Sequence, residues 1–188
     1  MTKPSATDGA WAVALGGLEW LAANYASVRF FTERDVVWTL LRWYSQQVAD
    51  QRMPISVFND FGAEPGQYRA LSADIALVLS DSPPIVMEFK YEPSHRRVDI
   101  GRGKFPVIAW SGVASDAERV ERWVRDARAA AGIAVLIDEG GAFAARAAAG
   151  HRWPVPVVAG GTWSHWGTYD QPDLDVYVHC VAVAPQAD

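Results

Sequence analysis

The chain has 188 residues, half of them apolar, with 17 basic and 22 acidic side chains and a net charge of −5. This length fits one domain with a sizeable core, and the apolar fraction excludes a disordered or collagen-like chain. The net negative charge argues against a protein that binds nucleic acid nonspecifically through an extended positive surface, although it is compatible with a local basic cleft. The single cysteine, Cys180, excludes an intrachain disulfide and suits a reducing cytoplasm.

The N-terminal segment 8–24 is expected to form an amphipathic helix that packs on the domain, weakened by Gly16 and Gly17. Its apolar stretch has the length of a signal-peptide core, but acidic residues lie on both sides of it. No run approaches the roughly 18 apolar residues that cross a bilayer. We therefore expect no membrane partner.

A stronger helix is predicted from Thr32 to about Val48, where apolar side chains recur at helical spacing. Thr32 is expected to cap this helix, with Asp35 three residues later completing the capping pattern. Glu33 falls in the first turn, where the unpaired amides and the helix dipole favour a carboxylate.

Beyond residue 54 the sequence changes to short apolar runs separated by turn-forming residues. Strands are expected at 55–58, 72–79, 85–91, 133–137, 155–158 and 174–183, with a further candidate at 105–110. Helices are expected at 116–131 and 142–150, and loops at 59–67 and 160–167. This order predicts an α/β fold with a central mixed β-sheet flanked by helices. No repeat or linker interrupts it, so we expect one domain over 1–188, with a core at about 32–138 and a β-rich extension at about 150–188.

The strongest chemical signal is Asp74 together with Glu88 and Lys90. Residues two apart in a strand share a face, so Glu88 and Lys90 point the same way while Met87 and Phe89 point into the core. A carboxylate and an ammonium on so apolar a strand cost free energy unless they have partners.

A hairpin supplies those partners. If 80–84 is its loop, Leu79 pairs with Ile85, and Asp74 then lies opposite Lys90. Asp74 and Glu88 become diagonal neighbours on one face, roughly 7–8 Å apart at the backbone, near enough to hold one metal ion. Two carboxylates and a lysine around an open site are what metal-assisted phosphodiester hydrolysis requires.

These residues resemble the PD-(D/E)xK nuclease superfamily, which has the restriction-endonuclease-like fold. The similarity rests on Ala73-Asp74, thirteen intervening residues, Glu88-Phe89-Lys90 and the preceding helix that opens with Glu33. It covers the element order of residues 32–138 and departs from the family at Ala73, where the name-giving proline would stand.

The resemblance implies that Asp74 and Glu88 bind Mg²⁺ or Mn²⁺, that Lys90 assists the attacking water, and that Glu33 supports the site. It implies a nucleic acid substrate, DNA in preference to RNA, and it is compatible with a homodimer because many proteins of this fold cut duplexes as dimers. The alternative that the residues themselves leave open is an exposed hairpin face on which Lys90 only pairs with a carboxylate.

The segment from Lys90 to Lys104 carries five basic and two acidic residues, a local balance of +3. One interpretation is that Arg96, Arg97 and Lys104 clamp a substrate phosphate beside the metal, and the other is an ordinary solvated loop. His95 is interpreted as a surface residue.

Three further patterns have competing interpretations. Four arginines at 119–128 are cancelled by four acids, which predicts a solvated, ion-paired helix face. Asp138-Glu139 is either an added metal ligand or a polar turn before two glycines. The tryptophans near 153–166 either stack on bases or fill a small core, and the latter is favoured.

The sequence thus predicts a cytoplasmic, metal-dependent nuclease. Two alternatives stay open: a non-catalytic module of the same fold that binds nucleic acid or protein, and a metal-dependent hydrolase of small phosphate esters.

Overall fold

The computed structural model describes residues 5–62, 72–97, 99–100, 107–150, 161–169 and 173–185. In chain order its elements are α1 (Ala6–Asn24), the 3₁₀ helix η1 (Tyr25–Ser27), α2 (Glu33–Asp50), β1 (Ile55–Gly62), β2 (Ser72–Leu79), β3 (Ile85–Glu92), α3 (Trp110–Arg125), β4 (Ala131–Glu139), α4 (Ala142–Ala148), β5 (Thr162–Tyr169) and β6 (Leu174–Val183). None of the described helices is both long and apolar enough to span a membrane.

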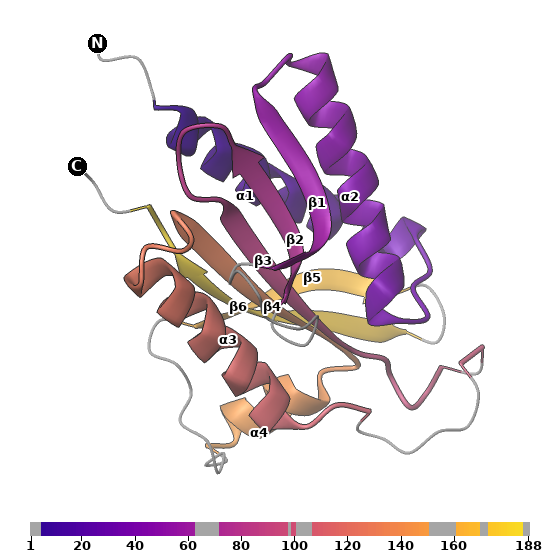
Figure 1. The fold of residues 1–188 in the computed structure, drawn as a ribbon. Helices are drawn as coiled ribbons and strands as arrows, with labels where there is room; N and C mark the ends of the chain where they lie inside the picture. The colour runs from indigo at the N-terminus through magenta and orange to yellow at the C-terminus, as the bar shows by residue number, and fades with distance from the viewer. Residues whose placement is uncertain are drawn as a thin grey trace.

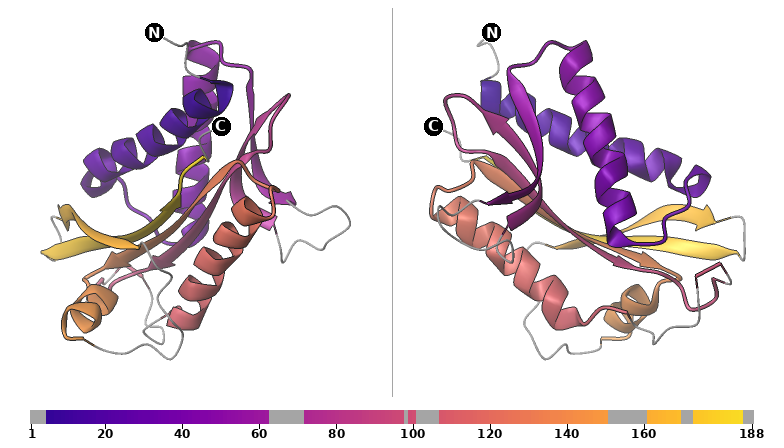
Figure 2. Two further views of the ribbon diagram at one scale, coloured as in Figure 1. Left: turned by 90° about the vertical axis from the view of Figure 1, so that its left-hand side faces the viewer. Right: turned by 45° about the vertical axis from the view of Figure 1, so that its right-hand side comes forward.

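The six strands form one mixed sheet in the order β1-β2-β3-β4-β6-β5 (Figure 1). β3 and β4 are parallel, and the other neighbours are antiparallel. Figure 2 shows α1 and α2 on one face of this sheet and α3 and α4 on the other. The predicted mixed sheet flanked by helices is confirmed.

The two faces follow from the alternation of side chains along β3. Ile85, Met87 and Phe89 are at most 1% exposed and join the core beneath α1 and α2. Val86 points the opposite way and packs with Trp123 of α3. The next two residues on that second face are the charged Glu88 and Lys90, so the sheet places them under α3.

The helix pair on the first face depends on one glycine. The hydroxyl of Tyr44 in α2 donates a hydrogen bond to the carbonyl of Ala14 in α1 at 2.9 Å. A Cβ at Gly17 would lie 2.3 Å from the Tyr44 ring. Gly17 therefore allows the two helices to approach, instead of merely weakening α1.

Several predicted boundaries are wrong. The expected loop from 59 begins inside β1, which continues to Gly62 around a positive φ at Asp60. Trp110 opens α3 six residues before the expected start at 116, because Trp110 and Val113 pack against Leu136 and Phe143. Residues 107–109 are not a strand, and Trp110 belongs to α3. Residues 105–106 and the expected strand at 155–158 lie outside the described residues.

The largest error concerns the segment 160–167, for which the sequence predicts a loop. Its described part, 161–167, contains most of β5, which pairs along β6 with Trp163 opposite His179 and His165 opposite Tyr177. A bulge follows His165, and Gly167 there adopts a φ of 122°. Antiparallel pairing with the next strand, β6, thus outweighs the local turn preference of the glycines.

Candidate active site

Asp74 and Glu88 meet where β2 and β3 separate. The two strands pair through Ile75 with Met87 and Ala76 with Val86, and one further step along this register brings Asp74 opposite Glu88. The predicted register, with Asp74 opposite Lys90, is therefore wrong by two residues. An even shift keeps every side chain on its predicted face, so the two carboxyl groups come closer than the expected diagonal spacing.

The carboxylate of Asp74 ends the β2–β3 ladder. Its Oδ2 accepts a hydrogen bond from the backbone amide of Phe89 at 2.7 Å. The carboxyl group also forms a hydrogen bond with that of Glu88, which is 2% exposed. The structure thus brings together the two residues that the sequence predicted as metal ligands.

Glu88 is also held by α3. Arg119 donates to Glu88 Oε1 from Nε at 3.0 Å, and its Nη2 lies 2.8 Å from the same oxygen. The Nη2 atom further donates to Asp116 Oδ1 at 2.8 Å. Both α3 residues face inward, with side chains 15% and 8% exposed.

Lys90 lies between two carboxylates from opposite sides of the sheet. Its Nζ is 2.9 Å from Asp116 Oδ2 in α3 and 3.5 Å from Glu33 Oε2 in the first turn of α2. The same Nζ donates to the carbonyl of Phe89 at 3.1 Å. The capping box of Thr32 and Asp35 begins α2 at the position that lets Glu33 reach this lysine.

Burial dominates the protonation of these groups. It raises the pKa of Glu88 to about 9, with a further increase from Asp74 that Arg119 only partly offsets. Burial likewise raises the pKa values of Asp74 and Glu33. For Lys90 burial acts in the opposite direction, but the Asp116 hydrogen bond and the surrounding carboxylates outweigh it, so its pKa is raised. The lysine is therefore an ammonium at neutral pH.

The fully ionised site has an excess of negative charge. Four carboxyl groups (Glu33, Asp74, Glu88, Asp116) accompany two cationic groups (Lys90, Arg119), which leaves a net charge of −2. One divalent cation would balance that charge. Among the described residues, no group of three or more His, Cys, Asp or Glu side chains is arranged to hold a metal ion. Mg²⁺ commonly binds through one or two carboxylates, with waters and substrate phosphates as its other ligands, and Asp74 with Glu88 fits that pattern.

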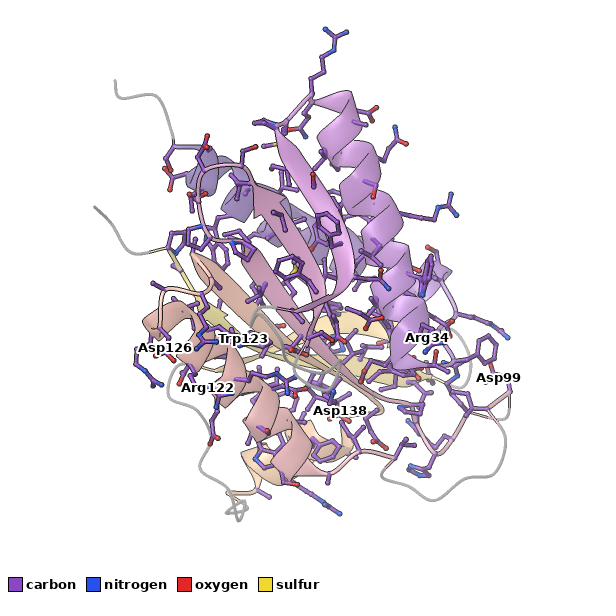
Figure 3. The ribbon with its side chains drawn as sticks, in the orientation of Figure 1. Arg34, Asp99, Arg122, Trp123, Asp126 and Asp138 are labelled. Atoms are coloured by element: carbon purple, nitrogen blue, oxygen red, sulfur yellow. The ribbon has the colours of Figure 1, made fainter. Side chains whose placement is uncertain are left out.

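The sequence interpretation missed Asp116 and Arg119. It grouped Arg119 with three other arginines on a solvated face, which is correct for the exposed Arg125 and for the exposed Arg122 (Figure 3). The signal for an inward pair was their spacing of three residues, in register with the buried Val113 and Val120. An expected helix start at 116 hid that signal, because Val113 then fell outside the helix.

The structure does not bring Arg96 and Arg97 together as the predicted phosphate-binding residues. Arg97 is buried, and its guanidinium is 3.1 Å from Glu139 and 2.7 Å from Asp99 while also donating to the carbonyl of Phe30. This engagement corrects the expectation of a substrate contact, because an arginine so enclosed has no edge facing a cleft. Arg96 is exposed and donates to the carbonyl of Asp173 at 3.3 Å. Lys104 lies outside the described residues.

Asp138 and Glu139 are structural residues at the end of β4, not an exposed turn. Asp138 is fully buried and accepts hydrogen bonds from three backbone amides that open α4 (Figure 3). Glu139 accepts from the Tyr25 hydroxyl at 2.9 Å and pairs with Arg97. These contacts satisfy both carboxylates without a metal ion.

The described aromatic rings of the C-terminal segment pack on the domain. Trp163 lies 5.1 Å from the ring of His179, and Trp166 lies 6.0 Å from that of Tyr25. This placement favours packing over base stacking, while Trp153 lies outside the described residues.

Six charged side chains from α2, β2, β3 and α3 therefore converge beside the point where two strands separate. Four of them are the residues predicted from the sequence, and α3 adds the other two. Comparison of the chain with protein-family models, with curated proteins and with solved structures finds no match in any of the three.

Proposed function

We propose that the protein is a metal-dependent nuclease of the PD-(D/E)xK type that hydrolyses phosphodiester bonds, in DNA more readily than in RNA. The observation that carries this proposal is the facing pair Asp74 and Glu88, with Lys90 on the same side of β3. The element order α2-β1-β2-β3-α3-β4 adds support, because a restriction-endonuclease-like fold requires it.

Asp74 and Glu88 would hold Mg²⁺ or Mn²⁺ through their carboxylate oxygens. The fit rests on charge and chemistry: hard oxygen donors, a net charge of −2, and carboxyl groups whose pKa values are raised when no cation compensates them. When bound, such a cation activates a water and offsets charge on the phosphate.

Lys90 acts as a fixed cation. Its raised pKa disfavours a role as general base, so its part is to orient the attacking water and to stabilise charge that develops on the phosphate. Glu33 and Asp116 hold the ammonium in place from two helices. Positioning of this kind costs no reorganisation at the moment of reaction.

The overall charge of −5 indicates weak contact with the polymer outside the site. Of the two described arginines of this segment, Arg96 lies at the surface, whereas Arg97 is buried and pairs with Glu139, so Arg97 adds nothing to a binding surface. Assembly as a homodimer and a cytoplasmic location belong to the same proposal.

The test is cleavage of supercoiled plasmid, single-stranded DNA and RNA with Mg²⁺ or Mn²⁺. We expect cleavage that EDTA abolishes, and a loss of at least about 10²-fold in Asp74→Ala and Lys90→Ala. Arg125→Ala is the matched control, because that side chain is 71% exposed on α3 and should leave the rate unchanged.

Each other outcome has a distinct meaning. Cleavage that persists in Asp74→Ala would contradict the assigned site. Binding of DNA without cleavage or metal uptake would identify a non-catalytic module, and hydrolysis of small esters alone would identify the third class of function.

A further inference from the structure

Arg119 is fixed on three sides. Its Nε and Nη2 atoms both contact Glu88 Oε1, and Nη2 also donates to Asp116 Oδ1. Its guanidinium carbon lies 5.5 Å from the ring centroid of the buried Trp123, one turn further along α3. A planar guanidinium held at its edge and its face has little freedom to rotate.

Both contacts from Arg119 fall on one oxygen of Glu88. Oε1 receives both Arg119 donors, which leaves Oε2 as the oxygen with capacity for another ligand. The carboxyl group of Asp74 is also a hydrogen-bonded neighbour of Glu88. The orientation of Glu88 toward Asp74 therefore depends on a residue from a different element.

The same arginine is connected to Lys90 through Asp116, whose two oxygens contact the two cations separately. One helix thus fixes the relative position of the carboxylate and the ammonium on β3. Residues that hydrogen-bond to a metal ligand and fix its orientation typically contribute 10- to 100-fold to metal affinity or activity.

We propose that Arg119 is a positioning residue of the metal site: it holds Oε1 of Glu88 so that the other oxygen stays available, beside Asp74, for the cation. This inference rests on the proposed function and deepens it, because it assigns a role to a residue outside the predicted set of ligands.

Simple electrostatics predicts the opposite effect of removing Arg119. A positive charge within hydrogen-bond distance of a metal ligand repels the cation, so its loss should strengthen binding. Positioning predicts that its loss weakens binding, because Glu88 becomes free to turn away from Asp74. Arg119 also lowers the pKa of Glu88, so loss of its charge makes that carboxyl group harder to ionise. Arg119→Lys keeps the charge without the planar fork of donors, and this variant therefore separates the two roles.

The experiment is calorimetric titration of the full chain with Mn²⁺ at pH 8. We expect the Kd of Arg119→Ala to rise at least about 10-fold above that of the wild type. Arg122→Ala is the matched control, an exposed arginine on the same helix, and should bind Mn²⁺ as the wild type does. Arg119→Met retains the packing on Trp123 and serves if the alanine variant does not fold.

A second measurement separates positioning from a general loss of structure. Guanidinium ion at millimolar concentration should restore Mn²⁺ affinity to Arg119→Ala, whereas ethylammonium should restore little, because only the planar group reproduces the fork of donors. Arg119→Lys should bind Mn²⁺ more weakly than the wild type for the same reason.

An unchanged or lower Kd for Mn²⁺ in Arg119→Ala and Arg119→Met overturns the inference. The proposed function is unaffected in that case, because the wild-type protein still binds Mn²⁺. Full affinity in Arg119→Lys shows a role of charge alone and also overturns it. Wild-type protein that takes up no Mn²⁺ overturns the metal site itself, and with it the role of Arg119.

Discussion

The Asp74 carboxylate accepts a hydrogen bond from the backbone amide of Phe89 at 2.7 Å. This side chain of β2 thus replaces the backbone carbonyl that would accept the hydrogen bond if the two strands continued to pair. The last backbone pair between β2 and β3 is Ile75 with Met87, next to Asp74 in β2. The amide of Phe89 is thereby satisfied, and the carboxylate of Asp74 is held in place.

Glu88→Gln should flatten the pH dependence of stability in the metal-free protein. The folded-state pKa of Glu88 lies near 9, above the ordinary 4.5, so the folded state retains a proton that the unfolded state releases. The free energy of unfolding must then fall as the pH rises through this window. Urea unfolding in EDTA between pH 6 and pH 9 measures the slope.

The control for this experiment is Glu118→Gln, which alters an exposed glutamate on the same helix as Arg119. It should retain the wild-type slope. Equal slopes in Glu88→Gln and the wild type would show that Glu88 is already ionised in the folded protein.

Arg97→Met should lower the free energy of unfolding by about 3–5 kcal/mol, because it leaves the buried carboxylate of Glu139 unpaired. The Kd for Mn²⁺ should be unchanged. Arg96→Met, at an exposed neighbouring position, should stay within about 0.5 kcal/mol of the wild type. A stable Arg97→Met that binds DNA more weakly would instead support a phosphate contact.

Gly17→Ala should destabilise the protein by about 1–3 kcal/mol, since its new methyl group would overlap the Tyr44 ring. The adjacent Gly16 is the matched control. Its Cβ would meet Trp43 at 3.4 Å, an ordinary contact, and alanine favours a helix over glycine by about 1 kcal/mol. Thermal unfolding of the two variants should therefore move in opposite directions, and a shared direction would contradict the close contact.

His179 should make the protein less stable in mild acid. Burial lowers its pKa below the ordinary 6.5, so the unfolded state takes up a proton that the folded state resists. The free energy of unfolding therefore falls as the pH drops from 7.5 to 5. His179→Gln should lose less stability over this range, as measured by urea unfolding.

His95→Gln, at an exposed position, should follow the wild-type profile. A profile of His179→Gln that matches the wild type would show that the imidazole becomes protonated in place between Trp110 and Trp163.

Local chemistry made much of this fold predictable. The cap of α2 depends on Thr32 and Asp35 alone, and the face shared by Glu88 and Lys90 depends only on strand alternation. The Asp74 register was not predictable, because it depends on how far β2 extends beyond β3 to pair with β1. The inward face of Asp116 and Arg119 was hidden because α3 begins at Trp110, where Trp110 and Val113 pack on Leu136, before the segment 116–128.

The pairing between β2 and β3 also has a mechanical consequence. In the stretch 72–92, all of which is described, these strands pair over three residues, whereas β1 and β2 pair over seven. The sheet is thus two ribbons joined by a short seam, and Asp74 and Glu88 lie on opposite sides of it. A hinge motion of the β1–β2 ribbon about this seam would change the distance between the carboxyl groups of Asp74 and Glu88. Bending of the sheet would therefore open or close the site.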